Sequence, residues 1–211
     1  MKISPAKQNI LKKIRQALSN TVPVPFPQSE GTDSVFQPPS QEPEIEFAEN
    51  FTKLQGRFSF CLSEKELAEQ LHQLAVTRNW DKIYCRETAV RDMLNEAGFT
   101  ADYTADLINC DASITGCEAL IARTGSIVMS SAQQSGRTTS VYAPVHICIA
   151  YTSQLRYDIK DALLGVKGKY QKLPSLITLA TGPSRTADIE KTLVVGVHGP
   201  KEVFCFLVEK Q

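Results

Sequence analysis

Short apolar segments alternate with amphipathic helical segments through the first half of this chain, and this alternation limits the folds open to it. Residues 57–62 and 82–85 are typical of buried strands. The helical segment after the first strand opens with Ser63 and Glu66, the spacing of a capping box, and the segment after the second ends at Gly98. Strands that alternate with helices in this way form a largely parallel sheet with helices packed against it.

The second half of the chain carries shorter and more crowded strands. Residues 119–122 and 127–129 are apolar and flank Arg123-Thr-Gly-Ser126, so we expect two strands joined through a glycine turn. Four further segments are typical of strands: residues 141–151, 175–180, 193–197 and 203–208. The predicted fold is therefore α/β, with a mostly parallel sheet flanked by helices and with antiparallel hairpins added.

The first 43 residues do not share this pattern. Residues 1–20 are predicted to hold an amphipathic helix, because four apolar residues recur there at helical spacing: Ile10, Leu11, Ile14 and Leu18. Residues 21–43 hold six of the chain's 11 prolines and are expected to form an extended linker, which leaves residues 44–211 as the α/β domain. The helix either docks on its own body, on a second copy or on a partner, or it is a frayed terminus.

Charge and hydropathy exclude several classes of protein. The chain has 23 basic and 23 acidic residues, so no long-range field attracts it to nucleic acid or to an anionic membrane. No apolar run approaches the roughly 20 residues of a membrane-spanning helix, and the N-terminus lacks the apolar core of a signal peptide. We expect a cytoplasmic protein with no membrane span and no nucleic-acid partner.

The six cysteines lack the spacing of a metal site. No two of them stand at the short spacing typical of zinc or iron–sulfur loops. Cys61, Cys148 and Cys205 lie in apolar runs, where a reduced cysteine behaves as a small hydrophobe. Cys117 lies in a polar break, and a reactive thiol there would need a neighbouring base. We expect neither a metal nor a cluster in this chain.

Residues 175–190 are the strongest local candidate for ligand contact. An apolar run is interrupted by Gly182-Pro183 and followed by a segment rich in hydroxyls and acids, which predicts a strand, a turn and the start of a helix. The backbone N–H groups of such a helix start favour an anion. Three side-chain donors stand at the same place: Ser184, Arg185 and Thr186.

A purely structural interpretation of this segment is equally open. Ser184 or Thr186 would cap the helix. Arg185 would pair with Asp188 or Glu190 on the surface. No glycine fingerprint of a dinucleotide site and no Walker-type phosphate loop occurs in the chain.

Four polar loops follow four apolar runs, at residues 123–126, 136–140, 181–188 and 198–201. Because open α/β sheets bind ligands at the carboxyl ends of their strands, we expect these loops to form one crevice, with the first and third on the same edge of one sheet. The predicted ligand-binding residues are Thr124, Gly125, Ser126, Gly136, Arg137, His146, Ser184, Arg185, Thr186, Asp188 and His198. Each histidine is either an acid or base, or a hydrogen-bonded structural residue.

Several motifs of the chain closely resemble the LUD domain of lactate-utilization protein C. They are Ile114-Thr-Gly-Cys-Glu-Ala-Leu-Ile-Ala-Arg-Thr-Gly-Ser-Ile-Val128, Pro144-Val-His146, Leu179-Ala-Thr-Gly-Pro-Ser-Arg-Thr-Ala-Asp-Ile-Glu190 and Gly196-Val-His-Gly-Pro200. The resemblance covers about residues 45–211 and implies a fold similar to the NagB/RpiA/CoA-transferase-like superfamily. It also implies iron–sulfur partner proteins, with which members of the family oxidise L-lactate to pyruvate, so clusters are expected in the partners and no cofactor in this chain.

One departure from the family pattern bears on catalysis. Where the family usually has Ala-Glu-Thr-Gly, this chain has Ala122-Arg-Thr-Gly125. A Glu in a comparable loop of related CoA-transferase folds can be a nucleophile, so Arg123 argues against covalent carboxylate catalysis at this position. Two functions stay open: a non-redox subunit of a lactate-oxidising complex that binds a small anion or organises its partners, and a self-sufficient CoA-transferase-like enzyme for an acyl or phosphorylated small molecule. Either function is compatible with a homo-oligomer.

Overall fold

The structure is a computed structural model that describes residues 5–19, 38–189, 192–196 and 198–210. The chain divides into two compact units, Met1–Pro38 and Pro39–Gln211. The described part of the first unit contains the predicted helix as α1 (Pro5–Leu18), on which Ile10 and Ile14 are exposed. Most of the predicted linker lies outside the described residues. Among the described helices, none is both long and apolar enough to cross a bilayer.

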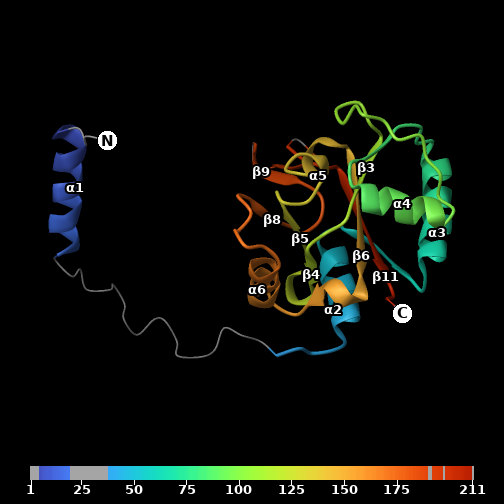
Figure 1. Cartoon of the computed structure of the whole chain (residues 1–211), viewed down its shortest axis with the longest axis horizontal. Coiled ribbons are helices and arrows are strands. Elements are labelled where there is room, and N and C mark those ends of the chain that lie inside the picture. The colour runs from blue at the N-terminus through green and yellow to red at the C-terminus, as the bar shows by residue number, and fades with distance from the viewer. Residues whose placement is uncertain (1–4, 20–37, 190–191, 197, 211) are drawn as a thin grey trace. The chain divides into compact units, whose positions relative to one another are not determined.

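The second unit contains the sheets and their covering helices (Figure 1). In chain order its elements are α2 (Pro43–Lys53), β1 (Arg57–Cys61), α3 (Glu64–Arg78), β2 (Ile83–Cys85), α4 (Thr88–Glu96), β3 (Ala112–Thr115), β4 (Ala119–Ile121), the short 3-10 helix η1 (Ala122–Thr124), β5 (Ser126–Ser130), α5 (Thr139–Tyr142), β6 (Val145–Tyr151), η2 (Thr152–Gln154), β7 (Leu155–Arg156), α6 (Ile159–Lys169), β8 (Ile177–Ala180), β9 (Arg185–Ile189), β10 (Thr192–Val195) and β11 (Glu202–Val208).

A five-stranded parallel sheet, which we call sheet A, forms the centre of this unit. Its strand order is β1-β11-β6-β3-β2. Strands β6 and β11 are buried along almost their whole length, because their near-continuous apolar sequences suit strands covered on both faces. Helices α3 and α4 pack on one face through the buried side chains of Leu67, Leu71 and Leu94. The predicted mostly parallel sheet with flanking helices is confirmed.

The opposite face of sheet A is covered by α2 and by a second sheet, sheet B, of order β7-β4-β5-β8. Helix α2 inserts Phe47 and Phe51, which are fully buried and stacked with their ring centroids 5.4 Å apart. Strand β5 runs antiparallel to both β4 and β8, which confirms the predicted hairpin through a glycine turn. Helix α6 covers the outer face of sheet B with Ala162 and Val166.

The predicted helix start after Gly182-Pro183 is wrong. Residues 185–189 form β9, which pairs antiparallel with β10. Ser, Thr and Asp at a helix start are only a local signal, whereas the β-branched residues of Thr192–Val195 offer a strand partner that no local pattern reveals. The strand predicted at residues 141–151 begins only at Val145, because Pro144 interrupts it and the residues before form the short helix α5.

Candidate functional site

The turn at residues 123–126 and the start of segment 181–188 lie at the same end of one sheet, as predicted. Strands β5 and β8 pair antiparallel with Ile127 opposite Ala180. The turn that precedes β5 and the turn that follows β8 therefore lie side by side at one end of sheet B.

Helix α2 and the residues that follow it pack against this end of sheet B. Gly125 has a φ of +59°, and a Cβ atom there would lie 2.4 Å from the backbone nitrogen of Phe51. Gly182 has a φ of +106°, and a Cβ atom there would lie 2.5 Å from the carbonyl oxygen of Leu54. Both glycines are needed because the backbone of α2 and of the residues that follow it approaches them closely.

The polar groups of the first turn are also used within the fold. Asn50 on α2 donates a hydrogen bond to the carbonyl oxygen of Arg123 at 3.2 Å. The Nε of Arg123 lies 2.7 Å from Oδ2 of Asp158, the N-cap residue of α6. The hydroxyls of Thr124 and Ser126 are hydrogen-bonded to each other at 2.7 Å. This turn joins α2, sheet B and α6, and Arg123 acts in it as an ion-pair partner.

The loop with Gly136 and Arg137 lies at the opposite end of sheet B. Nη2 of Arg137 donates a hydrogen bond to the hydroxyl of Ser175 at 2.6 Å, just before β8 begins. Because successive loops of antiparallel strands alternate between the two ends of a sheet, this loop is separated from the Ser126 turn. The prediction that all four polar loops form one crevice is wrong.

His146 lies inside the protein. Its strand neighbours Val145 and Ile147 pack with α3 and α4, so the His146 ring faces the other side of sheet A. The His146 side chain is 1 % exposed, and its Nε2 lies 2.8 Å from Oγ1 of Thr115 on β3. Burial lowers the pKa of His146 to about 4, so the ring is neutral near pH 7. This geometry favours the structural alternative for His146, a hydrogen-bonded core residue.

A hollow of about 610 Å³ lies at the amino ends of strands β6 and β11 of sheet A. Its volume is within the usual range of small-molecule pockets. The residues that line it are Ile108, Cys110, Val141, Tyr142, Pro144, Gly196, His198, Gly199 and Lys201. Among these, Lys201 has an ammonium group and His198 an imidazole, and none has a carboxylate. We name this cavity the His198 hollow.

Backbone hydrogen bonds hold the walls of the His198 hollow together. The N–H of Ser184 donates to the carbonyl of Pro200 at 3.0 Å, and the N–H of Gly196 donates to the carbonyl of Ser184 at 2.9 Å. The N–H of Lys201 donates to the carbonyl of Pro144 at 2.8 Å, which ties the loop to the start of β6. The structure therefore brings the predicted residues Ser184 and His198 together with the end of α5.

The remaining predicted residues are on β9. Arg185 pairs with Val195, and Val195 directly precedes Gly196, which lines the His198 hollow. The backbone of Arg185 therefore adjoins this hollow, and its side chain is exposed. The side chains of Thr186 and Asp188 lie outside the described residues. Contact of Arg185 with an anion stays a prediction, without the helix N-terminus that was expected to support it.

Sequence reasoning missed most of the apolar wall of the His198 hollow. Ile108 and Tyr142 are 74 % and 61 % exposed. Tyr142 lies two residues beyond the polar loop that ends at Ser140. Lys201 is the last residue of the fourth polar loop. The polar loops were therefore the sequence signal that could have indicated both residues. Exposed apolar groups beside the ammonium group of Lys201 and the imidazole of His198 suit an organic anion with a short apolar portion.

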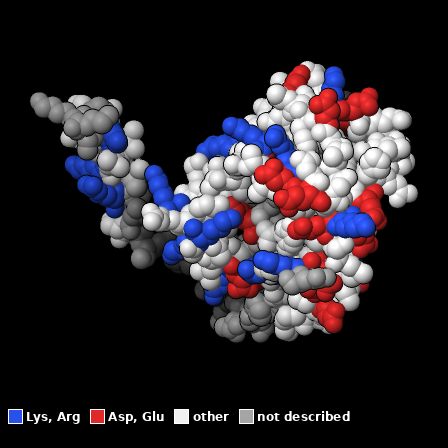
Figure 2. Space-filling view, turned by 45° about the vertical axis from the view of Figure 1, so that its right-hand side comes forward, with Lys and Arg blue, Asp and Glu red and all other residues white. Residues whose placement is uncertain are grey.

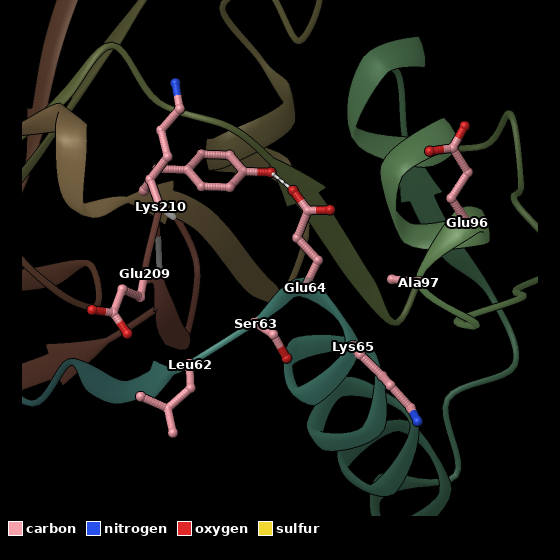
Figure 3. A pocket seen from close by; sticks show the side chains of 9 residues that line it. Leu62, Ser63, Glu64, Lys65, Glu96, Ala97, Glu209 and Lys210 are labelled. Atoms are coloured by element: carbon pink, nitrogen blue, oxygen red, sulfur yellow. Dashed lines mark hydrogen bonds between the residues drawn. The ribbon is translucent and has the colours of Figure 1, made fainter.

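A second hollow, of about 700 Å³, lies at the carboxyl ends of β1, β6 and β11 (Figure 3). There the hydroxyl of Tyr151 donates to Oε1 of Glu64 at 2.6 Å. Three carboxylates line it with two lysines: Glu64, Glu96, Glu209, Lys65 and Lys210. None of the predicted ligand-binding residues lines it, and its excess of carboxylates disfavours a small anion.

The described part of the chain contains no cluster of three or more His, Cys, Asp or Glu side chains that could hold a metal ion. All six cysteines are buried and unpaired as free thiols. Burial raises the pKa of Cys61 and Cys110 to about 11, so these thiols stay protonated and unreactive near pH 7.

The chain is similar to several curated bacterial proteins over about 100 residues. It is 39% identical over 95 residues to an uncharacterized protein of Neisseria meningitidis serogroup B, a match that covers 45% of this chain and 41% of that protein. It is 36% identical over 98 residues to lactate utilization protein C of Bacillus subtilis, covering 45% and 41%, and 33% identical over 105 residues to lactate utilization protein C of Deinococcus radiodurans, covering 49% of each. The matches span less than half the length of these relatives.

A solved structure shares the fold. The crystal structure of a DUF162 family protein from Deinococcus radiodurans superposes with a TM-score of 0.61 at 19% identity, covering 79% of this chain and 96% of that one. The model of the LUD domain matches residues 45–208, which is most of the chain. The chain belongs to the LUD domain family.

Proposed function

We propose that this chain is a non-redox component of a cytoplasmic lactate-utilization system, in which iron–sulfur partner proteins oxidise L-lactate to pyruvate. The family membership supports this proposal, together with the curated relatives named lactate utilization protein C. In this role the chain carries no cluster of its own and binds a small organic anion or organises its partners.

The His198 hollow is the observation that carries the small-anion role. Lys201 and His198 can donate hydrogen bonds to a carboxylate, and a charge-assisted hydrogen bond is stronger than a neutral one. Ile108 and Val141 offer apolar contact for a short carbon chain. A 2-hydroxy or 2-oxo acid such as lactate or pyruvate has both parts.

A self-sufficient CoA-transferase-like enzyme is the second candidate, and the loop at residues 122–125 argues against it. Arg123 stands where the family usually has Glu, and it is paired with Asp158. The turn itself is packed against α2 through Gly125. No carboxylate nucleophile is presented from this loop.

Binding of L-lactate and of pyruvate to the full chain tests the small-anion role directly, by chemical-shift titration. We expect shifts at Tyr142 and Lys201, and Lys201→Gln should weaken binding about tenfold, which corresponds to one lost charge-assisted hydrogen bond. Lys172→Gln, at another exposed lysine, is the matched control and should leave affinity unchanged. Equal affinity of both variants, or no titration with either acid, would refute a carboxylate site in this hollow.

Reconstitution separates the two candidate functions. A lactate-utilization component should be inert alone and should restore lactate oxidation when it is mixed with iron–sulfur partner proteins. Turnover of an acyl-CoA by the purified chain, without partners, would support the second candidate instead.

A further inference from the structure

The carboxyl ends of β1, β6 and β11 carry a continuous depressed surface that the proposed function does not use. The hollow of about 700 Å³ in Figure 3 adjoins one of about 460 Å³, and the two share Glu209 and Lys210. Besides these two residues, the smaller hollow is lined by Glu42, Glu44, Phe60 and Thr152. We call the joint surface the acidic face.

The acidic face has an excess of negative charge. Five carboxylates line the two hollows together with two lysines: Glu42, Glu44, Glu64, Glu96, Glu209, Lys65 and Lys210. The chain as a whole has no net charge, so this excess is local. On the face of the second unit seen in Figure 2, acidic side chains form several groups, with basic side chains between them. A local excess of this kind attracts cationic groups and disfavours anionic ligands.

Exposed apolar side chains lie among these carboxylates. Phe60 is 40 % exposed and Leu62 is 61 % exposed. Phe60 lies near the end of β1, which is an edge strand of sheet A, and Leu62 directly follows that strand. The backbone N–H of Glu209 donates to the carbonyl of Cys61 at 2.9 Å, so the backbone of this acidic residue lies directly beside the apolar pair. An apolar centre with a charged rim is typical of a surface that contacts another protein.

We propose that the acidic face binds a basic amphipathic segment of a partner protein, one that carries Lys and Arg around a row of apolar side chains. The apolar row would cover Phe60 and Leu62, and the basic side chains would approach the carboxylates of the rim. Charge complementarity selects this occupant, because an acidic or polar segment would meet the excess of negative charge or leave the apolar centre uncovered. The proposal concerns a different surface from the His198 hollow and does not depend on lactate binding.

Synthetic helical peptides test the proposal on the full chain. The probe is an amphipathic peptide of leucine and lysine at helical spacing, and the control peptide has glutamate in place of every lysine. We expect the lysine peptide to bind and to shift the amide signals of Phe60, Leu62 and Tyr151, and the glutamate peptide to give no shifts. Shifts that map to another part of the chain would overturn the proposal.

Charge reversal with a matched control separates this surface from general attraction. Glu42→Lys combined with Glu209→Lys should weaken binding of the lysine peptide about tenfold. The side chain of Glu42 makes no capping hydrogen bond, so the first of these changes removes no cap from α2. Glu69→Lys combined with Asp161→Lys changes the same charge at exposed carboxylates of α3 and α6 that line neither hollow, and it should leave affinity within about twofold. An equal loss in both pairs would overturn the proposal.

A further variant tests whether the apolar centre of the acidic face contributes to binding. Leu62→Ser removes an exposed side chain, so it should leave the melting temperature unchanged. It should weaken binding of the lysine peptide about fivefold. Unchanged affinity would show that only charge attracts the peptide, and it would also overturn the proposal.

Discussion

The ammonium group of Lys169 lies 2.7 Å from Oε2 of Glu118, whose side chain is 1 % exposed. The other carboxylate oxygen, Oε1, accepts hydrogen bonds from the hydroxyls of Ser130 at 2.6 Å and Tyr170 at 2.7 Å. One buried carboxylate thus joins the start of β4, the end of β5 and the end of α6. Burial by itself would raise the pKa of Glu118, but the three hydrogen bonds, from Lys169, Ser130 and Tyr170, hold that pKa below its ordinary value.

Glu118→Ala should lower the free energy of unfolding by about 2–3 kcal/mol, because it removes three hydrogen bonds to a buried charge. Since the folded pKa of Glu118 is lowered, its contribution is present above pH 4.5 and is lost as the pH falls further. Urea denaturation at pH 7 and pH 4 measures both effects. Lys167→Met, at an exposed lysine on the same helix, is the control and should change stability by less than about 0.5 kcal/mol. Equal effects of the two changes would contradict this role of Glu118.

His146 should make the protein lose stability as the pH falls from 6.5 towards 4. Its pKa is lowered from 6.5 to about 4 by burial, so the folded state resists protonation that the unfolded state accepts. The loss from this one residue amounts to about 3 kcal/mol once the pH is below 4. His146→Gln should remove this part of the pH dependence. Parallel stability curves of wild type and variant between pH 7 and pH 4 would contradict it.

Gly125→Ala should destabilise the protein far more than Gly136→Ala. Both glycines have positive φ, at +59° and +68°, so each substitution costs about 1–2 kcal/mol for the left-handed backbone. At Gly125 the new methyl group would also collide with the backbone of Phe51, which adds about 1–3 kcal/mol, whereas nothing lies within 4 Å of a Cβ atom at Gly136. Thermal melts of the two variants give the comparison, and equal losses would show that α2 does not dock on this turn.

Arg185→Ala should weaken binding of a small carboxylate while leaving folding nearly intact. Its side chain is exposed, and its backbone adjoins the His198 hollow. A guanidinium offers a planar fork of donors that matches a carboxylate. Titration with L-lactate and a thermal melt of the same variant decide the matter. A lower melting temperature with unchanged affinity would assign Arg185 a structural role.

Deletion of residues 1–38 should leave a folded domain that assembles poorly with a second copy or a partner. An isolated helix as short as α1 is marginal in water, and Ile10 and Ile14 are exposed on it, so its apolar face needs a protein surface. The cut at residue 38 spares α2, which begins at Pro43, whereas a cut at residue 43 would shorten it. Light scattering and melting of the truncated chain are the measurements. Unchanged assembly, or collapse of the domain, would count against the prediction.

Elements whose signals are local could be predicted from the sequence. The near-continuous apolar runs of β6 and β11 indicate strands buried on both faces, and these strands lie inside the parallel sheet. Ser63 and Glu66 indicate the start of α3, where the hydroxyl of Ser63 accepts a hydrogen bond from the N–H of Glu66. The motifs from Ile114 to Pro200 were enough to indicate the family. The strand and helix-start signals depend on residue type and on spacing within one turn or one strand.

Only the tertiary structure decided which loops meet. Residues 185–189 became a strand because Thr192–Val195 offered backbone partners, which outweighed the helix signals of their own sequence. The antiparallel course of β5 and β8 put Arg137 and Ser126 at opposite ends of sheet B. The donors to Glu118 lie up to 52 residues along the chain from it, at Tyr170. Long-range strand pairing and packing set these relations, and no pattern within one segment contains them.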